Sequence, residues 1–146
     1  MPIIPVLDLH YRLVNGADFN MVPDPVVANG LGLVYLKTSR TINLKYNSIL
    51  KVPTGIEIVR YPTFNLNSVP DIKVSVVGRC YSIPELEEEE GVSVLGPKFL
   101  TSDRYGEIIV TIKNFSQNIF RAERGEPIAL FAFELLPQVQ FTLADS

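Results

Sequence analysis

The sequence predicts an all-β protein, folded as a distorted jelly roll or β-barrel with at most one short helix. Two observations carry this prediction. Apolar and polar residues alternate with a period of two in several short segments, as in strands that bury one face. Eleven prolines and nine glycines are spread along the whole chain, and they leave little room for long helices.

The alternation defines the expected strands in chain order. Many short strands separated by turns are typical of β-sandwiches and barrels. The expected strands are residues 42–46, 56–58, 72–76, 108–113 and 139–143, the last with Val139, Phe141 and Leu143 on one face.

Turn-forming residues lie between these segments, and one segment has helical character. Asn, Gly and Pro favour the backbone angles of tight turns. Proline suits the first position of a helix and acidic residues suit its first turn, which predicts a short helix over residues 84–90. We expect turns at Asn15-Gly16, Asn29-Gly30, Pro53-Thr54-Gly55, Gly96-Pro97 and Arg124-Gly125.

Length and composition exclude several classes of protein. The 146 residues make one domain, 1–146. A net charge of -3 argues against nucleic acid as a partner. One Cys and one His exclude an internal disulfide framework and Cys- or His-rich metal sites. No apolar run approaches the roughly 18 residues of a membrane helix, and the N-terminus lacks a secretory signal. We expect a soluble intracellular protein without metal, cofactor, nucleic-acid partner or membrane insertion.

Five segments in order carry a resemblance to a known family. The segment Lys51-Val-Pro-Thr-Gly-Ile-Glu-Ile58 resembles the trimeric dUTPase family, and the resemblance continues almost to the last residue. The family's four motifs fall on Ala28-Asn-Gly-Leu-Gly-Leu33, on Gly78-Arg79-Cys80, on Leu100-Thr-Ser-Asp-Arg-Tyr-Gly-Glu-Ile108 and on Arg124-Gly-Glu-Pro-Ile-Ala-Leu130. The resemblance implies a jelly-roll fold and a homotrimer.

The same resemblance implies that the chemistry of the family is lost. Gly32 stands where a motif-one Asp helps to hold Mg²⁺ through water. Motif two keeps Arg79 but has Cys80 in place of Ser, and Thr101 replaces the motif-three Asp that orients the attacking water. Positioned acid–base groups are worth about 10²–10⁴-fold each, so we expect no dUTP hydrolysis.

The rest of the third motif is also altered. The Tyr that stacks under the deoxyribose falls on Arg104, and Tyr105 is displaced by one position, which points a strand side chain to the opposite face. Asp103 and Gly106 complete this degenerate hairpin. The Gly-rich lid motif of the family would begin at Ser146, where this sequence ends, so we expect no lid.

Several single residues have two interpretations. Arg79 is a possible anion contact, and we prefer an ion pair or an intersubunit contact. Cys80 is expected to be a packing residue and not a nucleophile, because the sole His10 is distant in sequence. Asp103, Arg104 and Glu107 are expected to form a surface charge cluster.

The acidic run Glu85, Glu87, Glu88, Glu89 and Glu90 is the strongest local charge feature. It lacks EF-hand spacing, so we expect a solvated segment and no Ca²⁺ site. It would repel a triphosphate near the former site.

The sequence therefore favours a non-catalytic, trimeric structural or protein-interaction module. Relatives of this kind occur among viral proteins, which implies a virion-surface or host-interaction role, in the host cytoplasm, nucleus or virion. Two alternatives stay open. One is a nucleotide phosphohydrolase with a rearranged site, using Asp103, Glu107 or the Glu run for a metal. The other is a nucleotide sensor that binds without cleaving, with Arg79 on the phosphates.

Overall fold

A computed structural model describes residues 9–26, 32–62, 74–101, 106–137 and 139–145. Over these residues the chain is mainly β-strand, with two short helical turns, η1 (Phe19–Met21) and η2 (Leu86–Glu90). The strands are β1 (His10–Leu13), β2 (Asp24–Pro25), β3 (Val34–Lys37), β4 (Ile42–Leu44), β5 (Ile49–Arg60), β6 (Val74–Tyr81), β7 (Val92–Gly96), β8 (Glu107–Asn114), β9 (Phe120–Ala122) and β10 (Pro127–Pro137).

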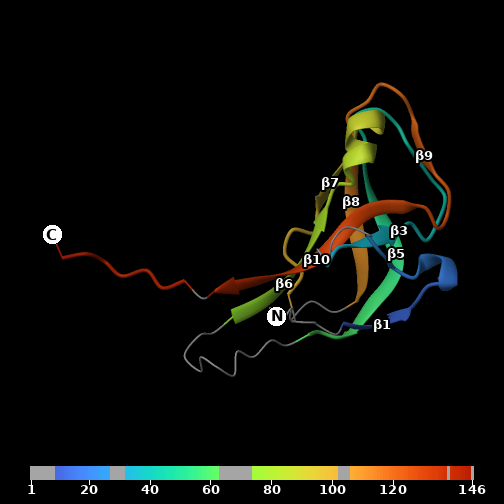
Figure 1. Ribbon diagram of the computed structural model, residues 1–146. Helices are drawn as coiled ribbons and strands as arrows, with labels where there is room; N and C mark the ends of the chain where they lie inside the picture. Colours follow the sequence, from blue (N-terminus) through green and yellow to red (C-terminus); the bar gives the residue numbers. More distant parts are fainter. Residues whose placement is uncertain (1–8, 27–31, 63–73, 102–105, 138, 146) are drawn as a thin grey trace.

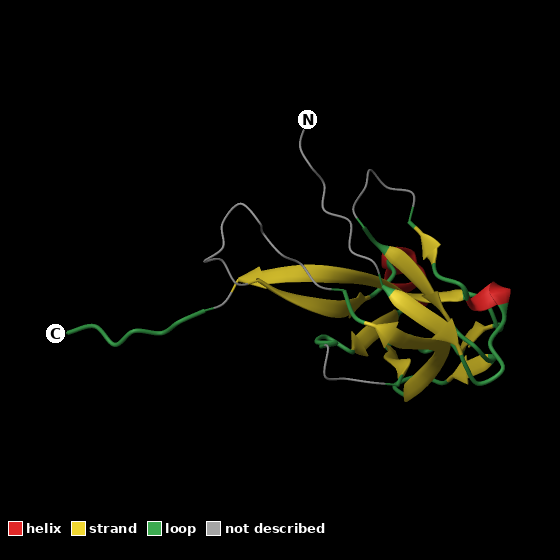
Figure 2. Cartoon of the chain, turned by 90° about the horizontal axis from the view of Figure 1, so that it is seen from below, coloured by secondary structure: helices red, strands yellow, loops and turns green. Residues whose placement is uncertain are grey.

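The strands form two four-stranded antiparallel sheets, ordered β1-β5-β8-β7 and β2-β3-β10-β6, and a two-stranded sheet of β4 with β9. The views in Figures 1 and 2 show these sheets wrapped into one barrel-like body. The predicted all-β fold class is confirmed. None of the helices in the described part of the chain is long and apolar enough to span a membrane.

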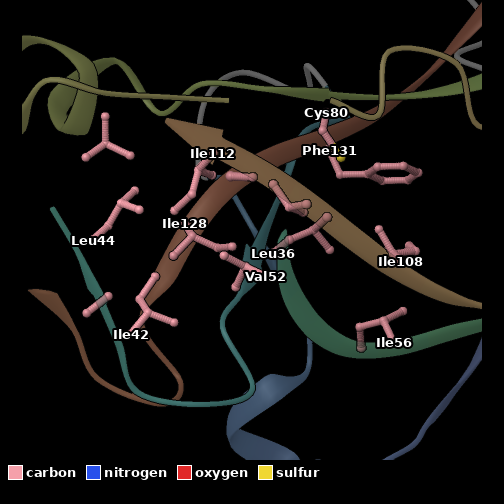
Figure 3. Close-up of a cluster of buried hydrophobic side chains, with 14 of the residues drawn as sticks. Leu36, Ile42, Leu44, Val52, Ile56, Cys80, Ile108, Ile112, Ile128 and Phe131 are labelled. Atoms are coloured by element: carbon pink, nitrogen blue, oxygen red, sulfur yellow. The ribbon is translucent and has the colours of Figure 1, made fainter. Parts of the chain in front are cut away.

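The core lies between the sheets and follows the alternation seen in the sequence (Figure 3). On β8, Ile108, Val110 and Ile112 are buried, and the residues between them face outward. Leu36 of β3 and Phe131 of β10 meet this row from the other sheet. Strands with one buried face are therefore the source of the core, as the period of two predicted.

Residues 53–55 are a correction to the predicted turns, because they lie inside the long strand β5. Gly55 has a φ of +72°, and the β5–β8 register shifts between Pro53 and Glu57. The backbone conformation that favours glycine here makes a β-bulge that bends the strand instead of ending it. The Thr54 hydroxyl, buried beside the bulge, donates to the Ile108 carbonyl at 2.7 Å.

The predicted helix and two of the predicted turns are present. Residues 84–90 form one helical segment, and Gly91 ends it with a φ of +69°. Asn15 and Gly16 form a turn with positive φ at both residues, and Arg124-Gly125 also forms a turn. The expected turn at 29–30 lies outside the described residues.

The strand expected over residues 139–143 is absent from the structure. The last strand ends at Pro137, and residues 139–145 lead away from the body of the protein (Figures 1 and 2). A strand needs a partner for its backbone N–H and C=O groups, and the described part of the chain offers none beside this segment. The alternation of apolar and polar residues gives no information on whether a neighbouring strand is present, so it could not predict this outcome.

Candidate functional site

The last part of β6 carries Arg79 and Cys80 of the second motif on opposite faces. Cys80 points into the core, where it is only 5% exposed. Burial raises the pKa of the Cys80 thiol to about 12, so the thiol is protonated at neutral pH and shielded from reagents. A nucleophilic cysteine needs the opposite setting, an exposed site with a lowered pKa.

Arg79 lies on the other face of β6, partly exposed and in contact with groups from the neighbouring strand and loop. Its Nη1 is 3.6 Å from Glu134 Oε1 on β10. Its Nε donates to the Lys98 carbonyl at 3.1 Å. The guanidinium also lies over two aromatic rings, with the centroids of Tyr81 and Phe99 at 6.0 and 5.4 Å. Arg79 thus has an ion-pair partner, a backbone acceptor and two cation–π contacts.

Glu134 is held toward Arg79 by the strand register and by a second donor. Across β6 and β10, Ala132 is opposite Arg79 and Glu134 is opposite Val77, which places Glu134 diagonally beside Arg79. The Tyr81 hydroxyl also donates a hydrogen bond to Glu134. The Glu134 carboxylate therefore partly neutralises the positive charge of the Arg79 guanidinium, which is the charge that would attract an anionic ligand.

The loop after β7 brings the start of the third motif alongside β6. Gly78 and Leu100 exchange two backbone hydrogen bonds, of 2.8 and 2.7 Å. The Tyr61 hydroxyl accepts from the Gly78 N–H at 2.8 Å and donates to the Leu100 carbonyl. Burial raises the pKa of Tyr61. These contacts place Thr101, the next residue, beside the strand that bears Arg79.

Of the remaining former-site positions, Gly32 and Gly106 are described, and they precede strands of different sheets. Gly32 is exposed just before β3, with a φ of +68°. In the sheet, β3 and β6 lie on opposite sides of β10. Gly106 precedes β8 with a φ of +115°. Three further predicted positions, Asp103, Arg104 and Tyr105, lie outside the described residues.

Glu107, expected in a surface charge cluster with Asp103 and Arg104, is partly exposed and has hydrogen-bond partners from other segments. Its side chain accepts a hydrogen bond from the Gly55 backbone N–H at 3.0 Å and another from the Asn15 side-chain amide. The carboxylate therefore braces the β5 bulge, and it belongs to the scaffold of the barrel. A cross-strand partner of this kind has no signature in the local sequence.

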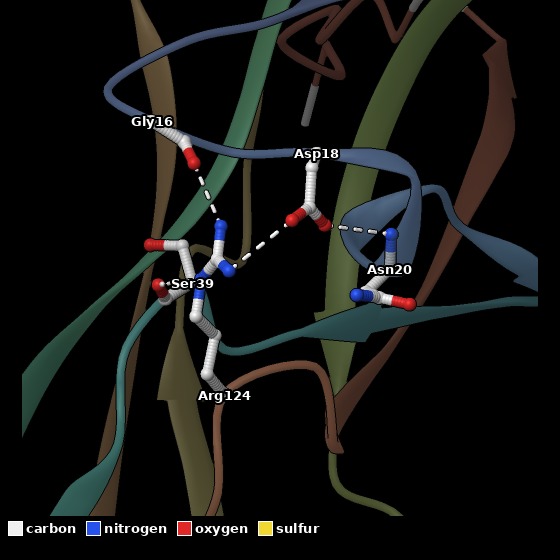
Figure 4. Close-up of polar contacts among 5 residues, drawn as sticks. All are labelled: Gly16, Asp18, Asn20, Ser39 and Arg124. Carbon is white, nitrogen blue, oxygen red and sulfur yellow. Dashed lines mark hydrogen bonds and ion pairs between the residues drawn. The ribbon is translucent and has the colours of Figure 1, made fainter.

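Arg124, from the fourth motif, joins three loops (Figure 4). It donates to the Gly16 carbonyl at 2.7 Å and to the Ser39 carbonyl at 3.1 Å, and it pairs with Asp18 at 3.2 Å. A hydrogen bond from the Asn20 backbone N–H, together with Arg124, holds the pKa of Asp18 below its usual value. Arg124 therefore has a structural role at the point where the chain enters β10.

The acidic run forms the exposed η2 turn. The Ser93 hydroxyl donates to Glu87 at 3.1 Å and ties the turn to β7. Across the described residues, no group of three or more His, Cys, Asp or Glu side chains is arranged to hold a metal ion.

The sequence singled out Arg79 but missed the residues around it. Glu134, Tyr81 and Phe99 come from β10, from β6 and from the loop after β7. In the sequence, these three residues could be recognised only by their residue types, because carboxylates and aromatic rings are common partners of arginine. Their positions follow from strand pairing, which the sequence did not specify.

Taken together, the two wrapped sheets, the bulged β5 and the ordered motif positions define an all-β protein with a dUTPase-like fold. No protein-family model matches the chain, and no curated protein matches it in sequence. A point mutant of the dUTPase of Staphylococcus bacteriophage 80alpha superposes with a TM-score of 0.70 at 13% identity, over 95% of this chain and 97% of that one.

Two further solved structures are similar to the same extent. The native dUTPase of EIAV has a TM-score of 0.68 at 14% identity, covering 94% of this chain and 97% of that one. The dUTPase of Streptococcus mutans has a TM-score of 0.65 at 15% identity, covering 90% and 98%. At such low identity these likenesses establish the fold, and function has to be argued from the site.

Proposed function

We propose that this chain is a non-catalytic protein with a dUTPase-like fold, acting as a homotrimeric structural or protein-interaction module. The observation that carries the proposal is the environment of Arg79. The one charged residue retained from the second motif is paired with Glu134 and bonded to the Lys98 carbonyl. To bind Arg79, a triphosphate would have to displace the Glu134 carboxylate from the guanidinium.

Two other positions support the loss of activity. Gly32 and Thr101 stand where the resemblance places the metal-binding and water-orienting carboxylates, and neither side chain can hold Mg²⁺ as an anion or accept a proton from water at neutral pH. The neighbouring Cys80 is a buried, protonated thiol. The positions 32 and 101 therefore lack the two carboxylates that the resembled family uses to hydrolyse a phosphoanhydride.

Assembly and source are part of the same proposal. The resembled family builds its sites between three subunits, and a ring of three copies would cover sheet edges. One similar structure comes from a bacteriophage whose dUTPase is described as controlling transfer of virulence genes by a proto-oncogenic G protein-like mechanism. That description supports a viral source for this chain and a partner-directed role for its fold.

One set of measurements tests this proposal against its two alternatives. The protein is incubated with dUTP or dCTP and Mg²⁺, and pyrophosphate release is followed. Calorimetry with non-hydrolysable deoxynucleotides is run in parallel. We expect neither turnover nor binding. Mg²⁺-dependent pyrophosphate would establish a rearranged hydrolase, and binding without cleavage would establish a nucleotide sensor.

Assembly is tested separately by light scattering. At micromolar concentration we expect three times the 16.3 kDa of one chain. The mass of a single chain would overturn the proposed trimer and leave the question of catalysis untouched.

A further inference from the structure

An apolar pocket lies between the two four-stranded sheets of the barrel. Its volume is about 200 Å³. Residues from β1, β5 and β8 line it on one side, and residues from β3 and β10 line it on the other. Protein interiors are close-packed, with few voids larger than a water molecule, so a space of this size is large enough to hold a small ligand.

The pocket has a buried floor and an exposed rim. The rim includes Tyr11, which is 37% exposed, and the partly exposed Val34. The floor residues all belong to the hydrophobic core, so their positions are held by packing, and the rim gives access from solvent. The floor, labelled in Figure 3, consists of four side chains that are at most 3% exposed, those of Leu36, Ile56, Ile108 and Phe131.

The floor of the pocket lies beside the β5 bulge. The β5–β8 register shifts between Pro53 and Glu57. Ile56 lies in this interval of β5, and Ile108 lies in the matching interval of β8. A bulge bends its strand and interrupts the regular ladder. Two of the four floor residues are therefore positioned by this irregular part of the sheet.

The lining determines which class of ligand the pocket suits. The described residues that line it are aliphatic or aromatic, and among them Tyr11 alone carries a polar side-chain atom. An ordered water molecule needs two to four polar partners, and a dry apolar cavity of about 150 Å³ is known to bind benzene. A charged group would lose its hydration here without gaining a partner. The pocket therefore favours an uncharged apolar molecule over a nucleotide or a phosphate.

We propose that this pocket is a binding site for a small uncharged apolar molecule of about the size of one six-membered ring. Moving such a molecule from water onto the floor residues is favourable because its apolar surface is buried. An aromatic ligand would also meet the rings of Tyr11 and Phe131, and aromatic rings attract one another in edge-to-face and offset geometries.

The site is distinct from the cluster around Arg79. Phe131 of the floor is directly opposite Cys80 in the β6–β10 register, and residues directly opposite one another point to the same face of a sheet. Both side chains are buried in the core, whereas Arg79 lies on the other face of β6. The site therefore depends neither on a nucleotide nor on the proposed trimer.

A titration followed by NMR tests the site in the full chain. The methyl groups of Ile, Leu and Val are labelled with ¹³C, and benzene or benzoate is added. We expect benzene to shift the methyl signals of Leu36, Ile56 and Ile108 saturably. Benzoate has the same ring with a charge and should leave them unchanged. The methyl groups of Ile42 and Val92 are the internal control, because these residues belong to the core and do not line the pocket.

A matched pair of variants tests whether the pocket itself holds the ligand. Val34→Phe places a ring at the rim and fills the space, so the saturable shifts caused by benzene should be lost. Val59→Phe makes the same change at a residue that is 57% exposed and does not line the pocket, so the shifts should remain as in wild type. The wild-type titration stands without these variants, should Val34→Phe fail to fold.

The outcomes decide the proposal without reference to assembly or catalysis. Saturable shifts confined to the floor residues, caused by benzene and absent with benzoate, would support the site. No saturable shift in wild type, or equal shifts at Ile42 and Val92, would overturn it. Shifts that persist in folded Val34→Phe would overturn the assignment of the ligand to this pocket, and equal binding of benzoate would overturn the proposed class of ligand.

Discussion

The carboxylate of Glu134 lies 3.6 Å from the guanidinium of Arg79, across the pair of strands β6 and β10. Both side chains are partly exposed, at 32% for Arg79 and 29% for Glu134, and the Tyr81 hydroxyl donates to the same carboxylate oxygen, Oε1. The retained arginine is therefore part of a partly exposed polar cluster.

Removing the carboxylate should restore some affinity of Arg79 for anions. We expect Glu134→Gln to bind tripolyphosphate more tightly than wild type by up to about fivefold, because a partly exposed ion pair is worth at most about 1 kcal/mol. Calorimetry at low salt measures this change. Glu90→Gln removes the same charge from the exposed η2 turn and serves as the control. Equal affinities in the two variants would show that Glu134 does not mask Arg79.

Restoring single carboxylates should not restore catalysis. We expect no Mg²⁺-dependent release of pyrophosphate from dUTP by Thr101→Asp, by Gly32→Asp or by the double variant, because catalytic groups that act together are strongly non-additive. Gly32 has a φ of +68° with open space around a would-be Cβ, and Asp tolerates that conformation better than most residues. A rate above background in Thr101→Asp alone would confirm the motif-three position and contradict the expectation.

The Cys80 thiol should be inert in the folded protein. At pH 8 we expect no reaction with a disulfide reagent until denaturant is added, when one thiol per chain reacts. Reaction of the native protein at the rate of a free thiol would contradict the burial of Cys80.

Cys80 should also make stability depend on alkaline pH. Burial raises its pKa from the usual 9.0 to about 12, so the folded state holds the proton more tightly than the unfolded state. The stabilisation is complete below pH 9 and is lost as the pH rises toward 12, by about 1.4 kcal/mol per pH unit. Urea unfolding between pH 8 and 11 should therefore show a shallower loss of stability in Cys80→Ala than in wild type.

Gly78 should not tolerate a larger side chain. A Cβ at this position would lie 2.8 Å from Cζ of Phe131 and 3.2 Å from Cβ of Leu100. We expect Gly78→Ala to lower the free energy of unfolding by about 1–3 kcal/mol, the usual cost of overpacking. Adding Phe131→Leu removes the clashing ring, so the double variant should lose less than the sum of the two single losses. Strict additivity in urea denaturation would contradict this contact.

Much of the fold was predictable because it depends on local chemistry. The alternation along residues 108–113 determined which face of β8 is buried, since side chains of a strand point alternately to its two faces. The proline and acidic residues of 84–90 likewise predicted the helical segment observed there, whereas the short turn η1 was not predicted. The ordered motif positions identified the dUTPase-like fold that the structure shows.

The rest was decided by contacts between strands that are distant in sequence. Whether Gly55 makes a turn or a bulge depended on its pairing with β8, and whether Arg79 is free depended on a register that brings Glu134 beside it. The alternation of residues 139–143 predicted a strand, but a strand exists only where another chain segment supplies its hydrogen-bond partners. A sequence pattern specifies which face of a segment is apolar, and only the tertiary structure specifies what that face and that backbone meet.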